Sequence, residues 1–483
     1  MSQAETPLRS ASSDASSGEP TERVGWMVPA IIGSALLMQT LDSTVLSNAL
    51  PTMAHALHTD PLRLNLAITM YMLATAVFLP VSGWAADRFG AKRIFMAAMV
   101  LFAVSSAACG FAHSLLDLVL ARIFQGMAGA MMVPVGRLVL LRTTPKHELV
   151  GAMSVLTMPA LLGPVIGPPI GGFIVTFWDW RWIFFANLPI ATVGVALVAR
   201  FVPNVKEQEV SPIDWTGLWL TGFGMAGLIF GFENLGRDLL PAPVVAGLFV
   251  GGGMCLYLYV LHARRAPNAI LDLSLFKVRT FNASVVGGAF MRMAMGANPF
   301  MLAMLLQIGF GMSAFRAGTL TFVSAAGALV MKTAAPPILR RFGFRTVLSI
   351  NAVIVGLSFM AYSLFRPTTP HWLLMIVLLI AGFFRSLQFT SLNGMAYADI
   401  EQSHMSRAST ISSMGQQLMQ SIGVGLAAML LHLLMTAHGQ TQMTAATISP
   451  AFLVIGAITF ISLAFYLRLP KDAGDAMNGR VAA

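Results

Sequence analysis

"LDSTVLSNALP", residues 41–51, places one carboxylate inside a run that is otherwise apolar from Trp26 onward. Of the 483 residues, 56% are hydrophobic and only 10% are charged, far from the balance of an ordinary soluble domain. The sequence therefore predicts an integral membrane protein. A charged group at the centre of a bilayer costs about 2.5–3.5 kcal/mol on insertion scales, so Asp42 is expected to face a cavity or a partner and not lipid.

The charge balance excludes other classes. A net charge of +10 on a soluble chain would suggest nucleic-acid binding, but here the charges lie between apolar runs and form no compact basic domain. We expect no nucleic-acid partner. Cys109 and Cys255 lie in separate apolar runs, so neither a disulfide framework nor a thiolate metal site is expected, and no cofactor is predicted.

Apolar runs long enough to cross a bilayer recur along the chain. A membrane helix needs about 20 mostly apolar residues to cross a core of roughly 30 Å. By this measure the sequence predicts fourteen transmembrane helices, at 26–48, 65–85, 94–113, 117–140, 150–177, 182–200, 213–234, 242–263, 283–308, 315–336, 345–365, 371–397, 408–436 and 450–468. Residues 1–25 are rich in Ser, Glu and Thr and lack an apolar run, so they are expected to form a disordered tail.

Basic residues indicate the orientation. An even number of spans puts both termini on one side, and most Lys and Arg residues fall in the first tail, the loops after even-numbered helices and the last tail. The positive-inside bias then predicts that both termini are cytoplasmic.

A short repeat indicates two related halves. "WAADRFGAKRIFM" (84–96) and "PILRRFGFRTVLS" (337–349) share Arg-Phe-Gly at an offset of 253, each after the second helix of a six-helix group. So short a match also arises by chance, but its equivalent place in both groups favours duplication. The predicted fold is all-α: a cytoplasmic tail (1–25), an N-terminal six-helix bundle (26–200), a linker with two extra transmembrane helices (201–280), a C-terminal six-helix bundle (281–468) and a second cytoplasmic tail (469–483).

Ionisable side chains in the predicted spans are functional candidates. The bases are Arg122, Arg137, Arg292, Lys332 and Arg385, and Asp42 is the one acid well inside a span. Lys332 lies near an inner helix end, where its long stem is expected to carry the ammonium to the interface. For Asp42 and Arg385 the alternative is a static buried pair that only fixes helix packing.

Helix depth links Asp42 to Arg122. With opposite helix directions, both lie on the order of 10 Å below the outer surface at 1.5 Å per residue. A salt bridge or a shared water cavity is feasible. Burial favours the protonated form of a carboxylate, whereas a neighbouring guanidinium favours its ionised form. If a ligand displaced Arg122, Asp42 would exchange its proton, so a proton and a substrate could compete for one site.

Two further segments suggest movement. "LLGPVIGPPIGGFI" (161–174) holds glycines four apart, which allow close helix approach, and prolines, which remove backbone donors. This favours a moving helix over a tight static crossing. "GWAADRFGAKR" (83–93) is expected to form a short cytoplasmic turn in which Gly90 permits the reversal and Asp87 pairs with a nearby Arg or a helix N-terminus. It would latch the two halves, and Arg340 replaces Asp87 in the second copy.

These segments resemble those of a known family. "LDSTVLSNALP", "GWAADRFGAKR", "LARIFQGMAGA" (120–130), "GPVIGPPIGG" (163–172) and "WRWIFFANLPI" (180–190) are similar, in order, to motifs of the major facilitator superfamily, in its fourteen-helix drug:proton antiporter branch. The resemblance extends over nearly the whole chain.

The resemblance implies a transporter of a bacterial-type inner membrane that is not an enzyme. It would act as a monomer and export small amphiphilic compounds by proton antiport with alternating access. The implied residues are Asp42, Arg122 and Arg292 for proton and substrate coupling; Gln125, Arg385 and Gln307 for the substrate cavity; Gly83, Asp87, Arg88, Gly90, Lys92 and Arg93 for the gating loop; and Gly163, Pro164, Gly167, Pro168, Gly171 and Gly172 for the flexible helix.

One departure bears on the substrate. Exporters of lipophilic cations are expected to carry several membrane acids, whereas this chain sets Asp42 against Arg122, Arg292 and Arg385. We therefore expect neutral, zwitterionic or anionic amphiphiles to be preferred. A facilitator or importer of a small organic anion is the alternative function. A membrane sensor is disfavoured because no soluble sensing domain exists, and an enzyme because no HExxH, GxSxG or His/Cys cluster occurs.

Overall fold

A computed structural model describes residues 26–57, 59, 61–204, 212–235, 240–437, 439 and 443–478. The described part is helical and contains no strand. The predicted tail at 1–25 lies outside these residues, and the predicted tail at 469–483 lies partly outside them. Twelve helices are long and apolar enough to cross a membrane, or thirteen if a bent pair counts as one span. The predicted count of fourteen is therefore confirmed only as far as twelve or thirteen.

The helices form two groups and a hairpin between them. The N-terminal group consists of α1 (Met27–Ala56), α2 (Pro61–Phe78), α3 (Val81–Phe89), α4 (Ala91–Gly110), α5 (Leu115–Thr143), α6 (Leu149–Phe177), α7 (Trp182–Phe185) and α8 (Asn187–Phe201). The hairpin is α9 (Trp215–Asn234) and α10 (Ala242–Ala263). The C-terminal group is α11 (Arg279–Asn282), α12 (Gly288–Met304), α13 (Ala314–Phe342), α14 (Phe344–Tyr362), α15 (His371–Met395), α16 (Met405–Ala437), α17 (Ala445–Ile461) and α18 (Leu463–Tyr466), and α19 (Asp475–Asn478) follows it.

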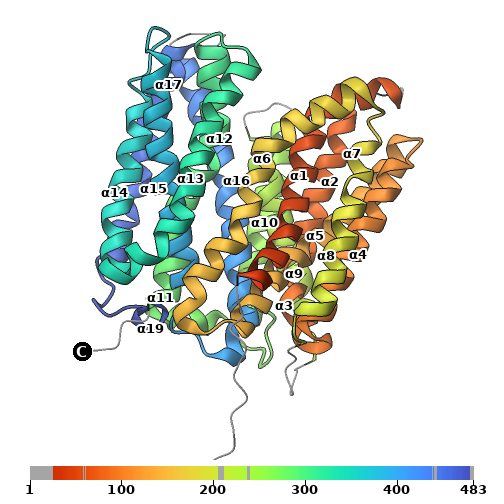
Figure 1. Cartoon of the computed structure of the whole chain (residues 1–483), viewed down its shortest axis with the longest axis vertical. Coiled ribbons are helices and arrows are strands. Elements are labelled where there is room, and N and C mark those ends of the chain that lie inside the picture. Colours follow the sequence, from red (N-terminus) through yellow and green to blue (C-terminus); the bar gives the residue numbers. More distant parts are fainter. Residues whose placement is uncertain are drawn as a thin grey trace, which may run out of the picture.

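The two groups stand side by side and diverge at one end (Figure 1). They approach each other at the end that carries α3 and α19, which we call the α3 end. Five hydrogen bonds between the described parts of the two groups lie toward this end. They join Ser82 to Thr410, Asp87 to Ser406, the Pro134 carbonyl to Ser409, Arg137 to Tyr397, and Lys146 to the Ala398 carbonyl.

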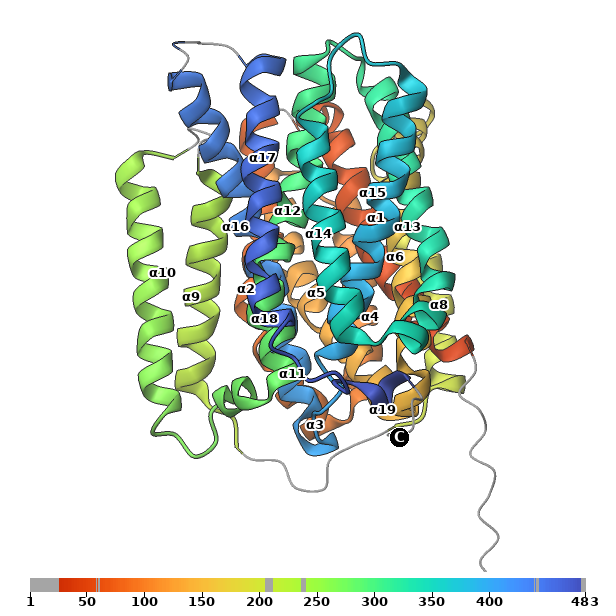
Figure 2. The ribbon, with the colours of Figure 1, turned by 90° about the vertical axis from the view of Figure 1, so that its left-hand side faces the viewer.

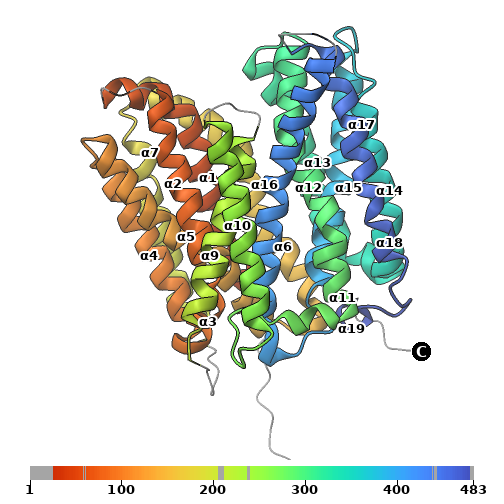
Figure 3. The same cartoon turned by 180° about the vertical axis from the view of Figure 1, so that it is seen from behind.

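The hairpin covers one flank of the bundle (Figures 2 and 3). On α9, Gly222 packs so closely on the Val77 backbone of α2 that an added Cβ would lie 2.7 Å from the Val77 oxygen. On the other side, Gly425 of α16 packs against Phe232 of α9, with a corresponding distance of 2.6 Å to its oxygen. The inserted helices therefore contact both groups.

The hairpin is tied back to the C-terminal group through the segment that follows it. The carboxylate of Asp272 lies 3.3 Å from His404 and 3.8 Å from Arg407, at the start of α16. Burial disfavours ionisation of this carboxyl, but hydrogen bonds from Ser274 and the charges of Arg407 and His404 outweigh burial and leave its pKa below the usual value.

The segment 83–93 differs from the predicted turn. Residues up to Phe89 belong to α3, which is bent by 60° from the end of α2, and Pro80, which cannot donate a backbone hydrogen bond, immediately precedes α3. Asp87 and Arg88 are therefore helical, and only Gly90 forms the reversal, with φ of +95°. Gly343, which is 253 residues later, makes the same reversal between α13 and α14 with φ of +76°. Glycine adopts this left-handed backbone without strain, so the repeated Arg-Phe-Gly has one structural role in both groups.

A row of glycines brings α6 against α1. Cβ atoms added at Gly163, Gly167 and Gly171 would lie 2.2 Å from Thr40 Oγ1, 2.1 Å from Thr44 Oγ1 and 3.0 Å from a Val45 methyl. Gly172 points elsewhere, with nothing within 4 Å of an added Cβ. The side chains of Pro164, Pro168 and Pro169 lie outside the described part, and α6 is one continuous helix. The glycine face of α6 therefore lies close against α1, and the movement predicted for this helix stays a prediction.

Gly163→Ala is expected to destabilise the protein, because its methyl group would overlap Thr40, including backbone carbon at 3.0 Å. Overpacking of this kind typically costs about 1–3 kcal/mol. Thermal unfolding in detergent should show a lowered Tm. Gly172→Ala is the matched control and should leave Tm unchanged or slightly raised. Equal Tm values for both variants would contradict the assigned helix contact.

Candidate functional site

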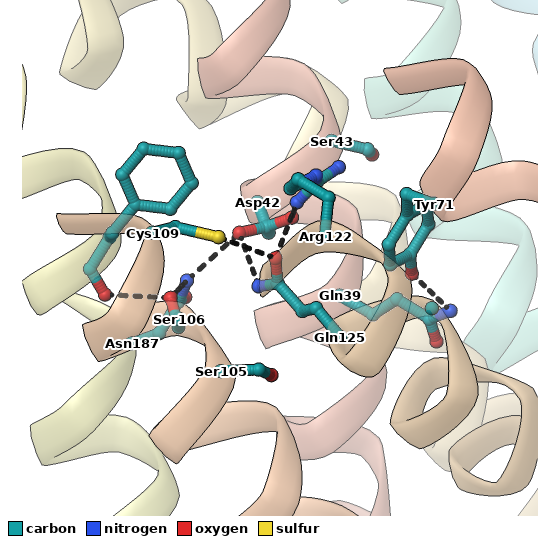
Figure 4. Close-up of polar contacts among 12 residues, drawn as sticks. Gln39, Asp42, Ser43, Tyr71, Ser105, Ser106, Cys109, Arg122, Gln125 and Asn187 are labelled. Atoms are coloured by element: carbon teal, nitrogen blue, oxygen red, sulfur yellow. Dashed lines mark hydrogen bonds and ion pairs between the residues drawn. The ribbon is translucent and has the colours of Figure 1, made fainter. Parts of the chain in front are cut away.

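Asp42 lies inside the N-terminal group with its charge paired (Figure 4). The residue is only 2% exposed, on α1. Its Oδ2 lies 2.6 Å from Nη1 of Arg122 on α5, which is 1% exposed. The predicted proximity of Asp42 and Arg122 is present as a direct salt bridge. Neither side chain faces lipid, because the described neighbours enclose both.

Amides complete the shell around Asp42. Gln125 Nε2 and Asn187 Nδ2 donate to Asp42 Oδ1 at 2.9 and 3.1 Å. Gln125 Oε1 in turn accepts from Arg122 Nη1 at 2.6 Å. Asn187 also donates to Ser106 Oγ, which donates to the Phe184 carbonyl. The carboxylate thus accepts hydrogen bonds from three side chains, which offsets much of the cost of burying it.

Arg122 connects this cluster to the neighbouring helix α2. Its guanidinium carbon lies 4.4 Å from the ring centroid of Tyr71, a cation–π contact. The Tyr71 hydroxyl accepts a hydrogen bond from Gln39 Nε2 at 3.0 Å. Gly126 lets α5 come this close to α2, since an added Cβ there would lie 2.3 Å from the backbone carbonyl oxygen of Tyr71. Arg122 Nε has no hydrogen-bond partner in the described part of the chain.

A central cavity of about 640 Å³ lies beside this cluster. Its walls come from α1, α2 and α5 on one side, from α12 and α16 on the other, and from the end of α9. Tyr71 and Gln39 line it, whereas Asp42, Arg122 and Gln125 do not. Asp42 therefore lies behind the cavity wall, with the Tyr71 ring and Arg122 between.

The cavity lining carries one base and one acid. Arg137 donates to the Tyr397 hydroxyl at 3.3 Å, and Glu233 comes from the inserted helix α9. The other polar lining is neutral, namely Gln39, Tyr71, Thr75, Ser413, Gln416, Gln417, Gln420 and Ser421. Sequence reasoning missed Glu233 because it stands at the end of a predicted span. The expected excess of arginines is not found in this lining, since Arg122, Arg292 and Arg385 are elsewhere.

The remaining candidates are dispersed. Arg292 is buried in α12, where Nη1 donates to the Ser284 carbonyl at 2.6 Å, and it does not contact the Asp42 cluster. Arg385 of α15 donates to Ser324 Oγ, and its guanidinium lies 5.9 Å from the Phe359 ring centroid. Gln307 is exposed in the π-helical turn Leu305–Gly309. None of these three lines the central cavity, so the structure brings only Asp42, Arg122 and Gln125 together.

At the α3 end, Asp87 joins the two groups. It accepts a hydrogen bond from Arg142 Nη2 at 2.7 Å and another from the Ser406 hydroxyl of α16. Gly83 allows this approach, because a Cβ there would lie 2.6 Å from Thr410 Oγ1. Asp87 therefore pairs with an Arg, one of the two predicted possibilities, and also binds the other group.

Four other predicted gating residues of segment 83–93 lie at the surface or on the N-terminal group. Arg88 and Arg93 are exposed, and Lys92 Nζ donates to the Ala199 carbonyl at 2.7 Å. Gly90 lies against Asn204, because a Cβ added at Gly90 would lie 2.6 Å from Asn204 Oδ1. Among the predicted gating residues, Asp87 and Gly83 contact α16 of the C-terminal group.

Arg122→Met is expected to lower Tm strongly, because breaking a buried pair leaves the Asp42 charge uncompensated, typically at a cost of about 3–5 kcal/mol. The double variant Asp42→Asn, Arg122→Met should recover part of that loss. Thermal unfolding of the four proteins in one detergent forms a double-mutant cycle. Additive effects of the two substitutions would show that the charges are not coupled.

Comparisons with known proteins agree with this architecture. The sequence profile described as "Major Facilitator Superfamily" matches residues 32–424 and 283–480. A protein of Salmonella heidelberg (strain SL476) named "Putative multidrug resistance protein MdtD" is 36% identical over 452 residues, covering 92% of this chain and 95% of the relative. Its namesake from Escherichia coli O7:K1 (strain IAI39 / ExPEC) is 36% identical over 440 residues, covering 91% and 92%.

Solved structures share the fold at low sequence identity. The human organic anion transporter MFSD10 (TETRAN) superposes with a TM-score of 0.65 at 13% identity, covering 93% of this chain and all of that one. The proton:xylose symporter XylE gives 0.64 at 13% identity, covering 93% and 96%. The profile and the relatives span most of the chain. The chain therefore belongs to the major facilitator superfamily, a family of membrane transporters and not enzymes, as its motifs predicted.

Proposed function

We propose that this protein exports small amphiphilic compounds across a bacterial-type inner membrane in exchange for protons. The observation that carries the proposal is the sealed ion pair of Asp42 and Arg122 behind the wall of the central cavity. A buried carboxylate held by a single cation is a proton acceptor whose charge state alters its surroundings. The multidrug-resistance names of the relatives support efflux as the direction.

The contacts suggest how a proton and a substrate affect each other. When Asp42 takes up a proton, its charge is cancelled and the attraction that holds Arg122 is lost. Arg122 packs on Tyr71, and Tyr71 with Gln39 forms part of the cavity wall. A substrate that presses this wall toward Asp42 would return Arg122 to the carboxylate, and the restored positive charge would favour release of the proton. Coupling then passes through Arg122 and Tyr71, in place of direct competition at Asp42.

The second element of the proposal is alternating access between the two helix groups. We take the N-terminal group, the hairpin and the C-terminal group as the working units, with both termini cytoplasmic by the positive-inside bias. The α3 end is then the cytoplasmic end, where Asp87 and Ser406 hold the groups together. The described arrangement would be the outward-facing one. Opening toward the cytoplasm requires the Asp87 contacts to break while the glycine face of α6 stays on α1.

The cavity walls indicate the substrate class. A volume of about 640 Å³ suits a drug-sized molecule, and the lining offers both apolar and polar side chains to an amphiphile. Arg137 and Glu233 offer opposite charges in the same space. We infer that amphiphiles with a zwitterionic or neutral polar part fit this cavity best. We also propose that the protein acts as a monomer.

Facilitated movement or import of a small organic anion is the second candidate. Arg137 in the cavity favours it, because an unaccompanied anion needs a fixed positive charge. Such a protein would not need the buried pair of Asp42 and Arg122, which is why export with proton exchange is preferred. The two functions differ in their response to a pH gradient.

Asp42→Asn should uncouple transport without abolishing it. Purified protein in proteoliposomes with an acidic lumen is given rhodamine 110, a zwitterionic dye. The native chain should accumulate it in proportion to the imposed gradient. In Asp42→Asn, accumulation should fall at least about tenfold, since the coupling of two sites is typically 1–3 kcal/mol. Exchange of dye without a gradient should persist.

Asp472→Asn supplies the control, because it makes the same chemical change at an exposed acid near the chain end. It should behave like the native protein. Native accumulation that ignores the pH gradient would favour the facilitator, and gradient-driven accumulation retained in Asp42→Asn would remove Asp42 from the mechanism.

A further inference from the structure

A second cavity of about 510 Å³ lies toward the α3 end, between the start of α1, the first half of α6 and the second half of α13. Its lining shares no residue with the central cavity. Apolar groups make up most of it, including Trp26, Pro29, Val155, Met158 and Pro336. Its size and composition match small-molecule sites, which are apolar with a few placed polar groups.

Lys332 is the charged residue buried in this lining. It is 3% exposed, so it does not reach the interface as predicted from its position near a helix end. The helix that carries it, α13, packs against α6 and α15. Nζ donates to Thr390 Oγ1 at 2.9 Å and lies 5.7 Å from the Phe389 ring centroid.

The ammonium lacks a counter-charge. It has three N–H donors, and Thr390 accepts one of them. No ion pair to Lys332 is found among the residues that the structure describes. An isolated buried ammonium is costly unless something compensates it, and the side that remains for compensation is the cavity that Lys332 lines.

The position equivalent to Lys332 in the N-terminal group carries no charge. The offset of 253 that relates the two groups places Leu79 at the position equivalent to Lys332. Leu79 is buried and apolar and lies at the bend between α2 and α3, so the N-terminal group carries no amine at this position. The lysine is therefore not part of the repeat that the two groups share.

The rest of the cavity is compatible with an anion. Arg340 lines the same space two turns further along α13, toward the α3 end. The one acid in the lining, Glu148, is exposed to solvent and lies 3.6 Å from His147. Lys332 and Arg340 thus place two bases of α13 in the lining of a mostly apolar pocket.

We propose that this cavity is a binding site for an amphiphilic anion, with its carboxylate or phosphate on the Lys332 ammonium and a short apolar tail along α6 and α1. The site is separate from the central cavity, and its existence does not depend on proton exchange. The same chemistry is available from a free organic acid or from an anionic lipid, so the experiment includes both sources.

The probe is radiolabelled decanoate, added to native protein in nanodiscs of phosphatidylcholine. Binding should be saturable, and Lys332→Gln should weaken it at least about tenfold, since hydrogen bonds to charged groups are the stronger class. Lys332→Arg keeps the charge and should retain most of the affinity, which separates loss of the site from misfolding. Uncharged decanol should not compete.

Arg137→Gln is the matched control, because it removes a buried cation from the central cavity and not from this one. It should bind decanoate as the native protein does. Phosphatidylglycerol in the nanodisc should reduce decanoate binding if a lipid is the natural occupant and leave it unchanged if a free acid is. Decanoate binding that Lys332→Gln does not weaken, or that Arg137→Gln abolishes, would overturn the proposal whatever the outcome for Asp42.

Discussion

The structure depends on one buried ion pair. Asp42 and Arg122 are nearly inaccessible, and three side chains donate hydrogen bonds to the carboxylate. Taking two charges out of water is expensive, and their attraction repays it only when geometry is good and the other lone pairs are satisfied. Four helices, α1, α4, α5 and α8, supply the pair and its shell. A change of charge at Asp42 therefore alters contacts that these four helices share.

Close backbone packing at glycines places this pair directly behind the cavity wall. Gly126 lets α5 approach the Tyr71 backbone, which sets the Tyr71 ring between Arg122 and the central cavity. Gly163 and Gly167 hold α6 against the α1 segment that carries Asp42. Gly83 brings α3 against α16, where Asp87 reaches Ser406. Close glycine contacts therefore occur at the Asp42 ion pair, at the cavity wall and at the contact between the two groups.

The sequence predicted the helices and the pairing of Asp42 with Arg122, because the length of an apolar run and the depth of a residue along a helix can both be counted along the chain. It did not reveal which face each side chain occupies, since helix rotation is set by tertiary packing. Asp42 therefore lies behind the cavity wall and not in it, and Lys332 is enclosed and not at the interface. Arg292 and Arg385 have partners of their own for the same reason. Glu233 reaches the cavity only because the inserted hairpin packs between the groups.

The most direct test of the central claim is the distance between the two groups at the α3 end as a function of pH. Spin labels replace Arg93 and Thr346, which are exposed and related by the 253-residue offset, in a chain whose two cysteines are changed to alanine. Protonation of Asp42 should release Arg122 and let this end open. We predict a longer distance at acidic than at alkaline pH in the parent protein, and the longer distance at every pH in Asp42→Asn. A pH response that is unchanged in Asp42→Asn would contradict the account.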